Sequence, residues 1–287
     1  MNIELMADYA CKVGESPMWH PIEKRIYWSD IVGGRLFRLD PKTGEHEEFY
    51  RGDMVGGMTL QADGQLMLFM MHGEVALWQE GKLDHIVSGI PKEKGFRFND
   101  VFVDPIGRVF CGSMSIDGTE LGRLYRLDID GSMTVVADGI GISNGMGLTP
   151  DLKQMYYTDS AVGEIYLFDY DQETGNIGNK RIFVKVPAAE GIPDGMTVDV
   201  EGFVWSARWH GGAVHRYAPN GVEQMRVEIP VPKVSSVTFG GDDMMDMYVT
   251  TAIEGSTKEI DGEHAGGLFR ARPGIKGQTE FLSRIKL

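Results

Sequence analysis

Short apolar segments recur along this chain, each preceded by a small group of polar and glycine residues. The clearest example is residues 192–199, in which Asp194 and a glycine lead into an apolar run. Matching segments place five other residues at the position of Asp194, namely Glu15, Gly56, Asn99, Asn144 and Ser235. The intervals between these six positions are 41, 43, 45, 50 and 41 residues. A repeat of this length predicts an architecture built from similar, adjoining units.

Each repeat predicts four short strands. The first strand follows the polar position, and the second is an aromatic or β-branched run such as residues 26–29. The third starts with a glycine and alternates apolar and polar residues, as in residues 122–128. The fourth is the least regular, which is typical of an exposed outer strand. Turn residues such as those at 104–107 separate the strands.

Six units of four strands predict an all-β protein, a six-bladed β-propeller of four-stranded antiparallel blades. A single blade would leave an apolar face exposed, so we expect the blades to close into a ring. The leading strand over residues 3–9 is expected to complete the sixth blade. The pattern contains no linker or long helical period, so residues 1–287 are expected to form a single domain. Residues 254–264 are expected to form a surface loop.

The net charge of the chain disfavours two classes of binding partner. The formal net charge of −14 disfavours nucleic acid and anionic membrane surfaces, since both would repel the protein. No apolar stretch approaches the roughly 18 residues that a spanning helix needs, and no signal peptide is recognisable. Cys11 and Cys111 make no disulfide framework and suit a reducing compartment. We therefore expect a cytoplasmic protein that acts on a small molecule, while the sequence indicates no oligomeric state.

The repeat also predicts a site. In a propeller, the loops that enter the first strands lie on one face of the ring, at the mouth of its central channel. Glu15, Asn99, Asn144 and Asp194 are then expected to line that mouth, with Arg97 beside them. Their hard oxygen donors favour Ca²⁺, Mg²⁺ or Mn²⁺ over softer metals. Taken singly, each residue fits a strand cap or an Asx turn equally well. Their shared symmetry position favours a metal.

Four short motifs make the interpretation more specific: Gly14-Glu15-Ser16-Pro17, Arg97-Phe98-Asn99-Asp100, Ser143-Asn144-Gly145 and Pro193-Asp194-Gly195-Met196. They resemble the motifs of the gluconolactonase family, which includes regucalcin, and the resemblance spans roughly residues 8–252. It implies a six-bladed propeller with one divalent metal at the channel mouth.

The resemblance also implies residue roles. Glu15, Asn144 and Asp194 would be the metal ligands, and Arg97 and Asn99 would hold a sugar lactone. Asp117 stands near the position of a substrate-contacting glutamate of regucalcin-type sequences and is one methylene shorter. This difference bears on sugar preference.

These parts suggest a mechanism. The metal would act as a Lewis acid on the lactone carbonyl, and a water molecule or hydroxide would attack it. Asp194 is expected to be the general base, and Arg97 is expected to bind substrate oxygens. We expect one divalent cation, Ca²⁺ in the first place, with Mg²⁺, Mn²⁺ or Zn²⁺ as alternatives.

Two other functions remain open on the sequence. One is a metal-dependent phosphotriesterase or aryl-esterase, although Arg97, Asn99 and Asp117 favour a hydroxylated substrate. The other is a non-catalytic propeller that serves as a protein-binding platform. A platform would not need oxygen ligands directed at one axis.

Two other motifs give only weak indications of a different site, namely a serine nucleophile and a calcium-binding loop. Residues 141–145 match the Gly-x-Ser-x-Gly pattern, but a strand rather than a helix is expected after the serine. Residues 169–175 are similar to a calcium-binding loop, but the glycine is displaced by one place and the closing glutamate is missing. We interpret this segment as a hairpin turn.

Overall fold

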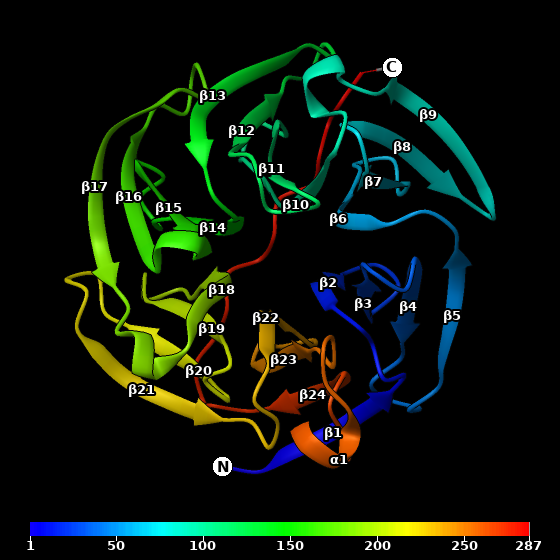
Figure 1. Cartoon of the computed structure of the whole chain (residues 1–287), viewed down its shortest axis with the longest axis vertical. Helices are drawn as coiled ribbons and strands as arrows, with labels where there is room; N and C mark the ends of the chain where they lie inside the picture. Colours follow the sequence, from blue (N-terminus) through cyan, green and yellow to red (C-terminus); the bar gives the residue numbers. More distant parts are fainter. Residues whose placement is uncertain (287) are drawn as a thin grey trace.

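The computed structural model describes residues 1–286 and shows six four-stranded antiparallel sheets arranged as blades around a central channel (Figure 1). The predicted six-bladed β-propeller is therefore confirmed. Blade 1 comprises β2 (Gly14–His20), β3 (Arg25–Asp30), β4 (Arg35–Leu39) and β5 (His46–Arg51). Blade 2 comprises β6 (Val55–Leu60), β7 (Leu66–Met70), β8 (Glu74–Gln79) and β9 (Lys82–Ser88). Blade 3 comprises β10 (Phe96–Val103), β11 (Val109–Ser115), β12 (Gly122–Leu127) and β13 (Met133–Ile140).

Blades 4 and 5 follow the same order from the channel outwards. They comprise β14 (Ser143–Leu148), β15 (Gln154–Asp159), β16 (Glu164–Tyr170) and β17 (Ile177–Lys185); and β18 (Ile192–Val198), β19 (Val204–Trp209), β20 (Ala213–Tyr217) and β21 (Glu223–Glu228). The helical segments are single turns: the 3₁₀ segments η1 (Pro91–Glu93), η2 (Ser160–Val162) and η3 (Ala188–Glu190), and the α-helix α1 (Lys258–Asp261).

Blade 6 is built from both ends of the chain. It comprises β22 (Val234–Gly240), β23 (Asp246–Thr251), β24 (Gly267–Ala271) and, as its outer strand, β1 (Ile3–Asp8). β1 pairs antiparallel with β24 from Ile3 opposite Ala271 to Asp8 opposite Gly267. The prediction that the leading strand completes the sixth blade is confirmed, and this pairing closes the ring.

Burial explains the differing regularity of the strands. The innermost strands β6, β14 and β22 are buried at every residue, whereas the outer strands β9 and β17 are largely exposed. The apolar core lies between neighbouring blades rather than on the axis. For example, Met67 and Phe69 of blade 2 pack with Phe98 and Cys111 of blade 3. Each blade therefore buries its apolar faces only against its neighbours, as the repeat predicted.

A cavity of about 430 Å³ occupies the end of the channel that is lined by the C-terminal residues 278–282. Met58, Met146 and Met196 occupy equivalent positions on three inner strands, and they line the cavity while packing into the core between blades. These methionines therefore have a packing role between the blades.

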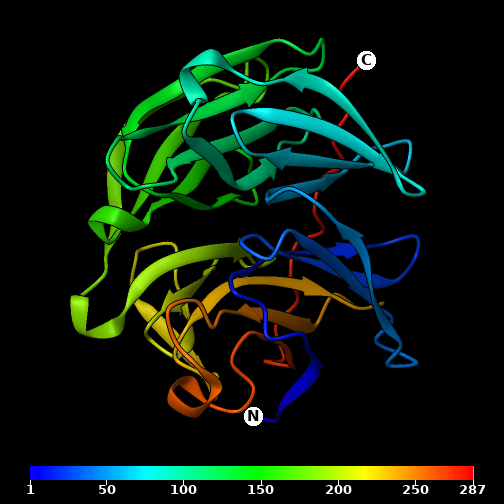
Figure 2. The same ribbon diagram turned by 45° about the vertical axis from the view of Figure 1, so that its right-hand side comes forward.

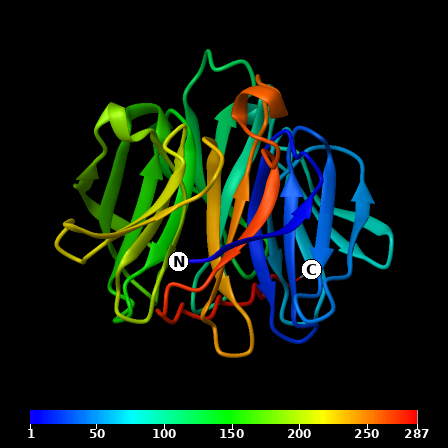
Figure 3. The same cartoon turned by 90° about the horizontal axis from the view of Figure 1, so that it is seen from below.

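The C-terminal segment, residues 275–286, closes the channel at the face opposite α1 (Figures 1, 2 and 3, red). It crosses the ring as a strap that joins four blades. The amides of Gly277, Ser283 and Arg284 donate to carbonyls of Met244 in blade 6, Leu60 in blade 2 and Gly107 in blade 3, and Gln278 reaches Asp199 beside blade 5. We refer to this segment as the strap.

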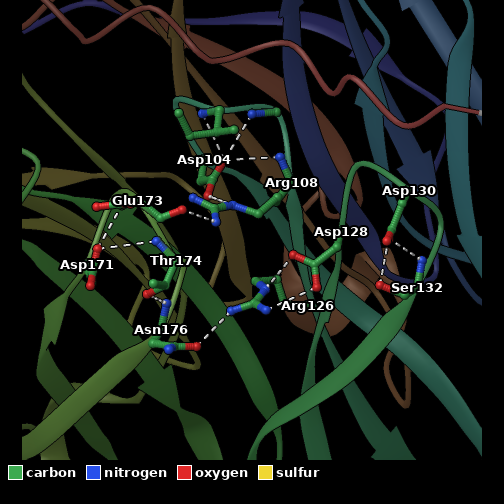
Figure 4. Close-up of polar contacts among 12 residues, drawn as sticks. Asp104, Arg108, Arg126, Asp128, Asp130, Ser132, Asp171, Glu173, Thr174 and Asn176 are labelled. Atoms are coloured by element: carbon green, nitrogen blue, oxygen red, sulfur yellow. Dashed lines mark hydrogen bonds and ion pairs between the residues drawn. The ribbon is translucent and has the colours of Figure 1, made fainter.

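The turns on the strap side are fixed by buried ion pairs (Figure 4). Asp104 accepts hydrogen bonds from three successive backbone amides and from Arg108, whose Nε lies 2.6 Å from Oδ2. Arg108 in turn donates to the carbonyls of Gln172 and Glu173 in the next blade. Residues 169–175 thus lie in the hairpin formed by β16 and β17, as expected. Two of their carbonyl oxygens accept hydrogen bonds from the guanidinium of Arg108 instead of facing a metal ion.

Within residues 1–286, no helix has the length and apolar character needed to cross a bilayer. Cys11 and Cys111 are both free and buried.

Candidate metal centre and substrate site

A β-bulge interrupts the innermost strand of every blade at the level of the repeated polar residue. The pairing register shifts between Glu15 and Met18, between Phe98 and Val101, and between Pro193 and Met196, with equivalent shifts in the other three blades. A bulge breaks the alternation of side chains between the two faces of a strand. The polar residues can therefore turn towards the channel while the apolar residues that follow stay in the core.

Hydrogen bonds at four of the six junctions between blades hold these bulges against their neighbours. Oγ of Ser16 donates to the carbonyl of Gly56, Nδ2 of Asn99 donates to the carbonyl of Ser143 at 2.7 Å, and Oγ of Ser160 donates to the carbonyl of Pro193 at 2.6 Å. Ser235 Oγ donates to the carbonyl of Gly14 and links blade 6 to blade 1. The candidate ligands are thus positioned by the closure of the ring.

Glu15, Asn144 and Asp194, the three predicted ligands, are buried at the channel mouth, with exposed fractions of 2%, 4% and 6%. Nδ2 of Asn144 donates to Oγ of Ser160 at 2.9 Å, which fixes the amide orientation. Oδ1 of the same amide is buried and has no hydrogen-bond partner within residues 1–286. A buried oxygen without a donor is costly unless a ligand occupies it, so this atom fits a metal ligand.

The electrostatics of the two acids point the same way. Burial raises the pKa of Glu15 well above its ordinary value, and the charges of Asp194 and Asp100 raise it further. Burial likewise raises the pKa of Asp194, and repulsion by Asp100 adds to it. These two carboxylates are thus close enough to repel each other in a poorly solvated place. A bound divalent cation would remove that repulsion.

Asp100 is a third buried acid that the repeat pattern did not single out. It lines the cavity in the channel, and burial raises its pKa to about 7 despite the opposing charge of Arg97. Strict strand alternation would send Asn99 and Asp100 to opposite faces, and the bulge brings both to the channel. The motif Arg97-Phe98-Asn99-Asp100 contained the residue, but nothing in it indicated the bulge.

Arg97 and Asn99 lie together, as predicted. Nη1 of Arg97 donates to Oδ1 of Asn99 at 2.5 Å and to the carbonyl of Phe98 at 3.0 Å. Burial lowers the pKa of Arg97, while the charges of Glu15, Asp100, Glu254 and Asp194 oppose this shift. Since Nη1 alone makes the hydrogen bonds found within residues 1–286, the other guanidinium donors are available to a substrate.

Asp117 is placed differently from the other predicted residues. It is exposed on the loop between β11 and β12, where Oδ1 accepts hydrogen bonds from Ser115 Oγ and from the amide and hydroxyl of Thr119. These bonds lower the pKa of Asp117 to about 2. The structure brings Asp117 into contact with neither Arg97 nor Asn99, and its substrate role stays a prediction.

The Gly-x-Ser-x-Gly match does not form a nucleophile elbow. Ser143 is fully buried and begins strand β14, so the expected strand context is confirmed. Its oxygen is enclosed rather than presented on a sharp turn between a strand and a helix.

A second cluster of potential ligands lies in blade 5, where ligand atoms of Glu190, His215 and Glu223 are all within 4.8 Å of one another. Arg226 lies 3.2 Å from Glu223 and 3.9 Å from Glu190 and balances their charge. Burial and the charge of Arg208 lower the pKa of His215 to about 4. With two guanidinium groups beside two carboxylates, this cluster is an ion-pair network, and the channel mouth is the better candidate for a metal.

Fold and site together define a class: a six-bladed β-propeller with buried carboxylate and carboxamide oxygens at its channel mouth. Residues 13–253 match the model of the SMP-30/Gluconolactonase/LRE-like region family. The chain belongs to this family.

Similar proteins extend over almost the whole chain. Pentonolactonase XacC of Haloferax volcanii is 46% identical over 293 residues, covering 100% of both chains. Regucalcin of Xenopus laevis is 34% identical and covers 96% of each chain. The solved structure of a calcium-binding protein, regucalcin, from Agrobacterium tumefaciens has a TM-score of 0.90, with 25% identity over 98% of this chain and 97% of that one.

Proposed function

We propose that this protein hydrolyses a sugar lactone, opening an aldonolactone to the aldonic acid, at the channel mouth with the help of one divalent cation. One observation carries the proposal: three buried carboxylates, Glu15, Asp100 and Asp194, act on one another's pKa together with the half-buried guanidinium of Arg97, and the buried Oδ1 of Asn144 has no hydrogen-bond partner within residues 1–286. With all three acids ionised, the group has an excess of two negative charges, which a divalent cation would neutralise. The similarity to proteins named pentonolactonase and regucalcin supports the choice of substrate class.

Glu15, Asn144 and Asp194 would hold the cation. Their oxygen donors suit Ca²⁺ first, and Mg²⁺, Mn²⁺ or Zn²⁺ are the alternatives. The similarity to a structure named as a calcium-binding protein supports this order. A bound cation supplies Lewis-acid polarisation of the lactone carbonyl.

The chain itself supplies the remaining chemistry. Asp194 accepts a proton from the attacking water. The water oxygen bonds to the carbonyl carbon, the ring C–O bond breaks, and the released alkoxide takes up the proton that Asp194 accepted. Arg97 holds substrate oxygens with its free donors, and Asn99 orients Arg97. The acid product releases one proton at neutral pH.

That proton gives the test. We expect chelated protein to be inactive in a weakly buffered indicator assay with five- and six-carbon aldonolactones, and activity to return when Ca²⁺, Mg²⁺, Mn²⁺ or Zn²⁺ is added singly. Asp194→Ala should stay inactive with every metal, whereas Asp130→Ala, which changes an exposed turn residue, should behave as the unchanged protein.

Absence of turnover with every lactone and metal would overturn the proposal. Assays with aryl esters and phosphotriesters would then distinguish another hydrolase from a non-catalytic platform.

A further inference from the structure

Glu254 is a carboxylate whose charge acts on Arg97 and to which no role has been given. Arg97 belongs to blade 3, and Glu254 follows β23 of blade 6, which lies across the ring (Figure 1). Glu254 is exposed, and β23 ends on the face that carries α1 (Figure 3). Glu254 therefore stands on the same face as the candidate site, on its far side.

Backbone contacts place Glu254 next to the entry of the first blade. The amides of Ile253 and Glu254 both donate to the carbonyl of Lys12, and Ala252 forms a bridge with Val13. Glu15 follows within the same segment. Moreover, the carboxylate of Glu254 raises the pKa of Arg97 against the effect of burial, so the two charges lie near enough to interact.

A buried lysine fixes this part of the wall. Lys233 is only 4% exposed, and its Nζ donates to the carbonyl of Glu254 at 2.8 Å and to Oδ2 of Asp261 at 2.7 Å. Lys258 and His264 attach the same insertion to Asp8 of β1. The insertion, expected from sequence to be a plain surface loop, is therefore anchored at several points and holds Glu254 in a defined position.

We propose that Glu254 forms the far wall of the substrate site and selects hydroxylated lactones by accepting hydrogen bonds from ring hydroxyl groups. This inference rests on the proposed lactone hydrolysis. Arg97 offers donors on one side of the mouth, and an ionised carboxylate offers only acceptors on the other. A polyhydroxylated ring can satisfy both sides at once, whereas a ring without hydroxyls can use only Arg97. Lys233 is a positioning residue that acts through Glu254.

The test compares Glu254→Ala with the unchanged protein on an aldonolactone and on a lactone of the same ring size without ring hydroxyls. We expect KM for the aldonolactone to rise about tenfold, as for loss of one hydrogen bond to a charged group, with kcat within about twofold. Kinetics with the unsubstituted lactone should not change. Glu254→Gln retains an acceptor oxygen and should recover part of the loss. Lys233→Met should shift KM in the same direction.

Glu263→Ala is the matched control, because it removes another exposed carboxylate from the same insertion, and it should leave both substrates unaffected. Equal changes for both lactones in Glu254→Ala, or no change in either, would overturn the role of Glu254 while leaving lactone hydrolysis standing. If the unchanged protein hydrolyses neither lactone, the proposed function fails, and this inference fails with it.

Discussion

At the scale of single residues, the mouth of the channel is an arrangement of buried acids whose charges repel one another. Glu15, Asn144 and Asp194 could be selected from the sequence as candidate ligands because they stand at the same position of the repeat. Asp100 could not, because its place depends on a backbone irregularity rather than on residue type. The predicted ligands are those that obey the repeat, and the missed acid is the one that departs from strand alternation.

We predict that Asp100→Asn stabilises the metal-free protein at pH 8.5 and has little effect at pH 4. The folded-state pKa of about 7 lies above the unfolded value, so the folded protein binds this proton more tightly. Stability is therefore lost as pH rises from about 4 to about 7, and the full loss, on the order of 4 kcal/mol, is present above that range. Thermal unfolding at both pH values measures the difference.

Glu280→Gln is the control for this prediction. Desolvation by the surrounding protein also raises the pKa of Glu280 to about 7, although its side chain is exposed to the cavity in the channel; this residue belongs to the strap and accepts a hydrogen bond from Thr238 at 2.7 Å. Saturating Ca²⁺ should remove the advantage of Asp100→Asn and leave that of Glu280→Gln. An advantage of Asp100→Asn that persists with metal would contradict the neutralisation argument.

At the scale of the element, the inner strand with its bulge is the unit that builds the site. Its apolar run and its turns were readable from sequence, since they follow the alternation expected of strands. The bulge left no comparable signal, because the residues at it differ from blade to blade: Glu15-Ser16, Gly56-Gly57 and Asp194-Gly195. What these segments share is a close approach to the neighbouring inner strand, which becomes visible only once the ring is closed.

Gly195 shows how tight this approach is, because a Cβ at this position would overlap Ser236 of the next blade. We predict that Gly195→Ala lowers stability by about 1–3 kcal/mol, the usual range for overpacking. It should also weaken metal binding, because Asp194 is the adjacent residue. Urea unfolding and calorimetric titration with Ca²⁺ measure the two effects.

Gly178→Ala serves as the comparison, because a Cβ at Gly178 on the outer strand β17 would meet no atom within 4 Å. It should change neither quantity. Equal behaviour of the two variants would show that the contact between inner strands is not critical.

At the scale of the whole molecule, the ring is held together by β1 in blade 6 and by the strap across the channel. The sequence predicted that the leading strand would complete the sixth blade, and the pairing of β1 with β24 confirms it. The strap escaped prediction because residues 275–286 have no periodic pattern, and their hydrogen bonds go to four different blades. Long-range contacts of this kind are not encoded in local alternation.

We predict that removal of residues 275–287 lowers the melting temperature by on the order of 10 °C. The truncation withdraws buried Ile285 and the partly buried Phe281 and Leu282, each worth roughly 1–3 kcal/mol, and opens the channel from below. Calorimetry measures the shift.

Ile285→Ala should reproduce part of this loss, whereas Ile260→Ala, at a residue that is 76% exposed, should cause none. A truncated protein that melts with the unchanged one would show that the strap does not brace the ring.

The pairing of β1 with β24 also bears on the order in which the protein can be made. β1 finds its partner only after β24, at residues 267–271, has been synthesised. Closing so long a loop is entropically unfavourable and tends to slow folding. Until then, the outer edge of the last blade is missing and the first blade lacks its neighbour. The nascent chain is therefore an open arc with unpaired edges, the state in which chaperone assistance matters most.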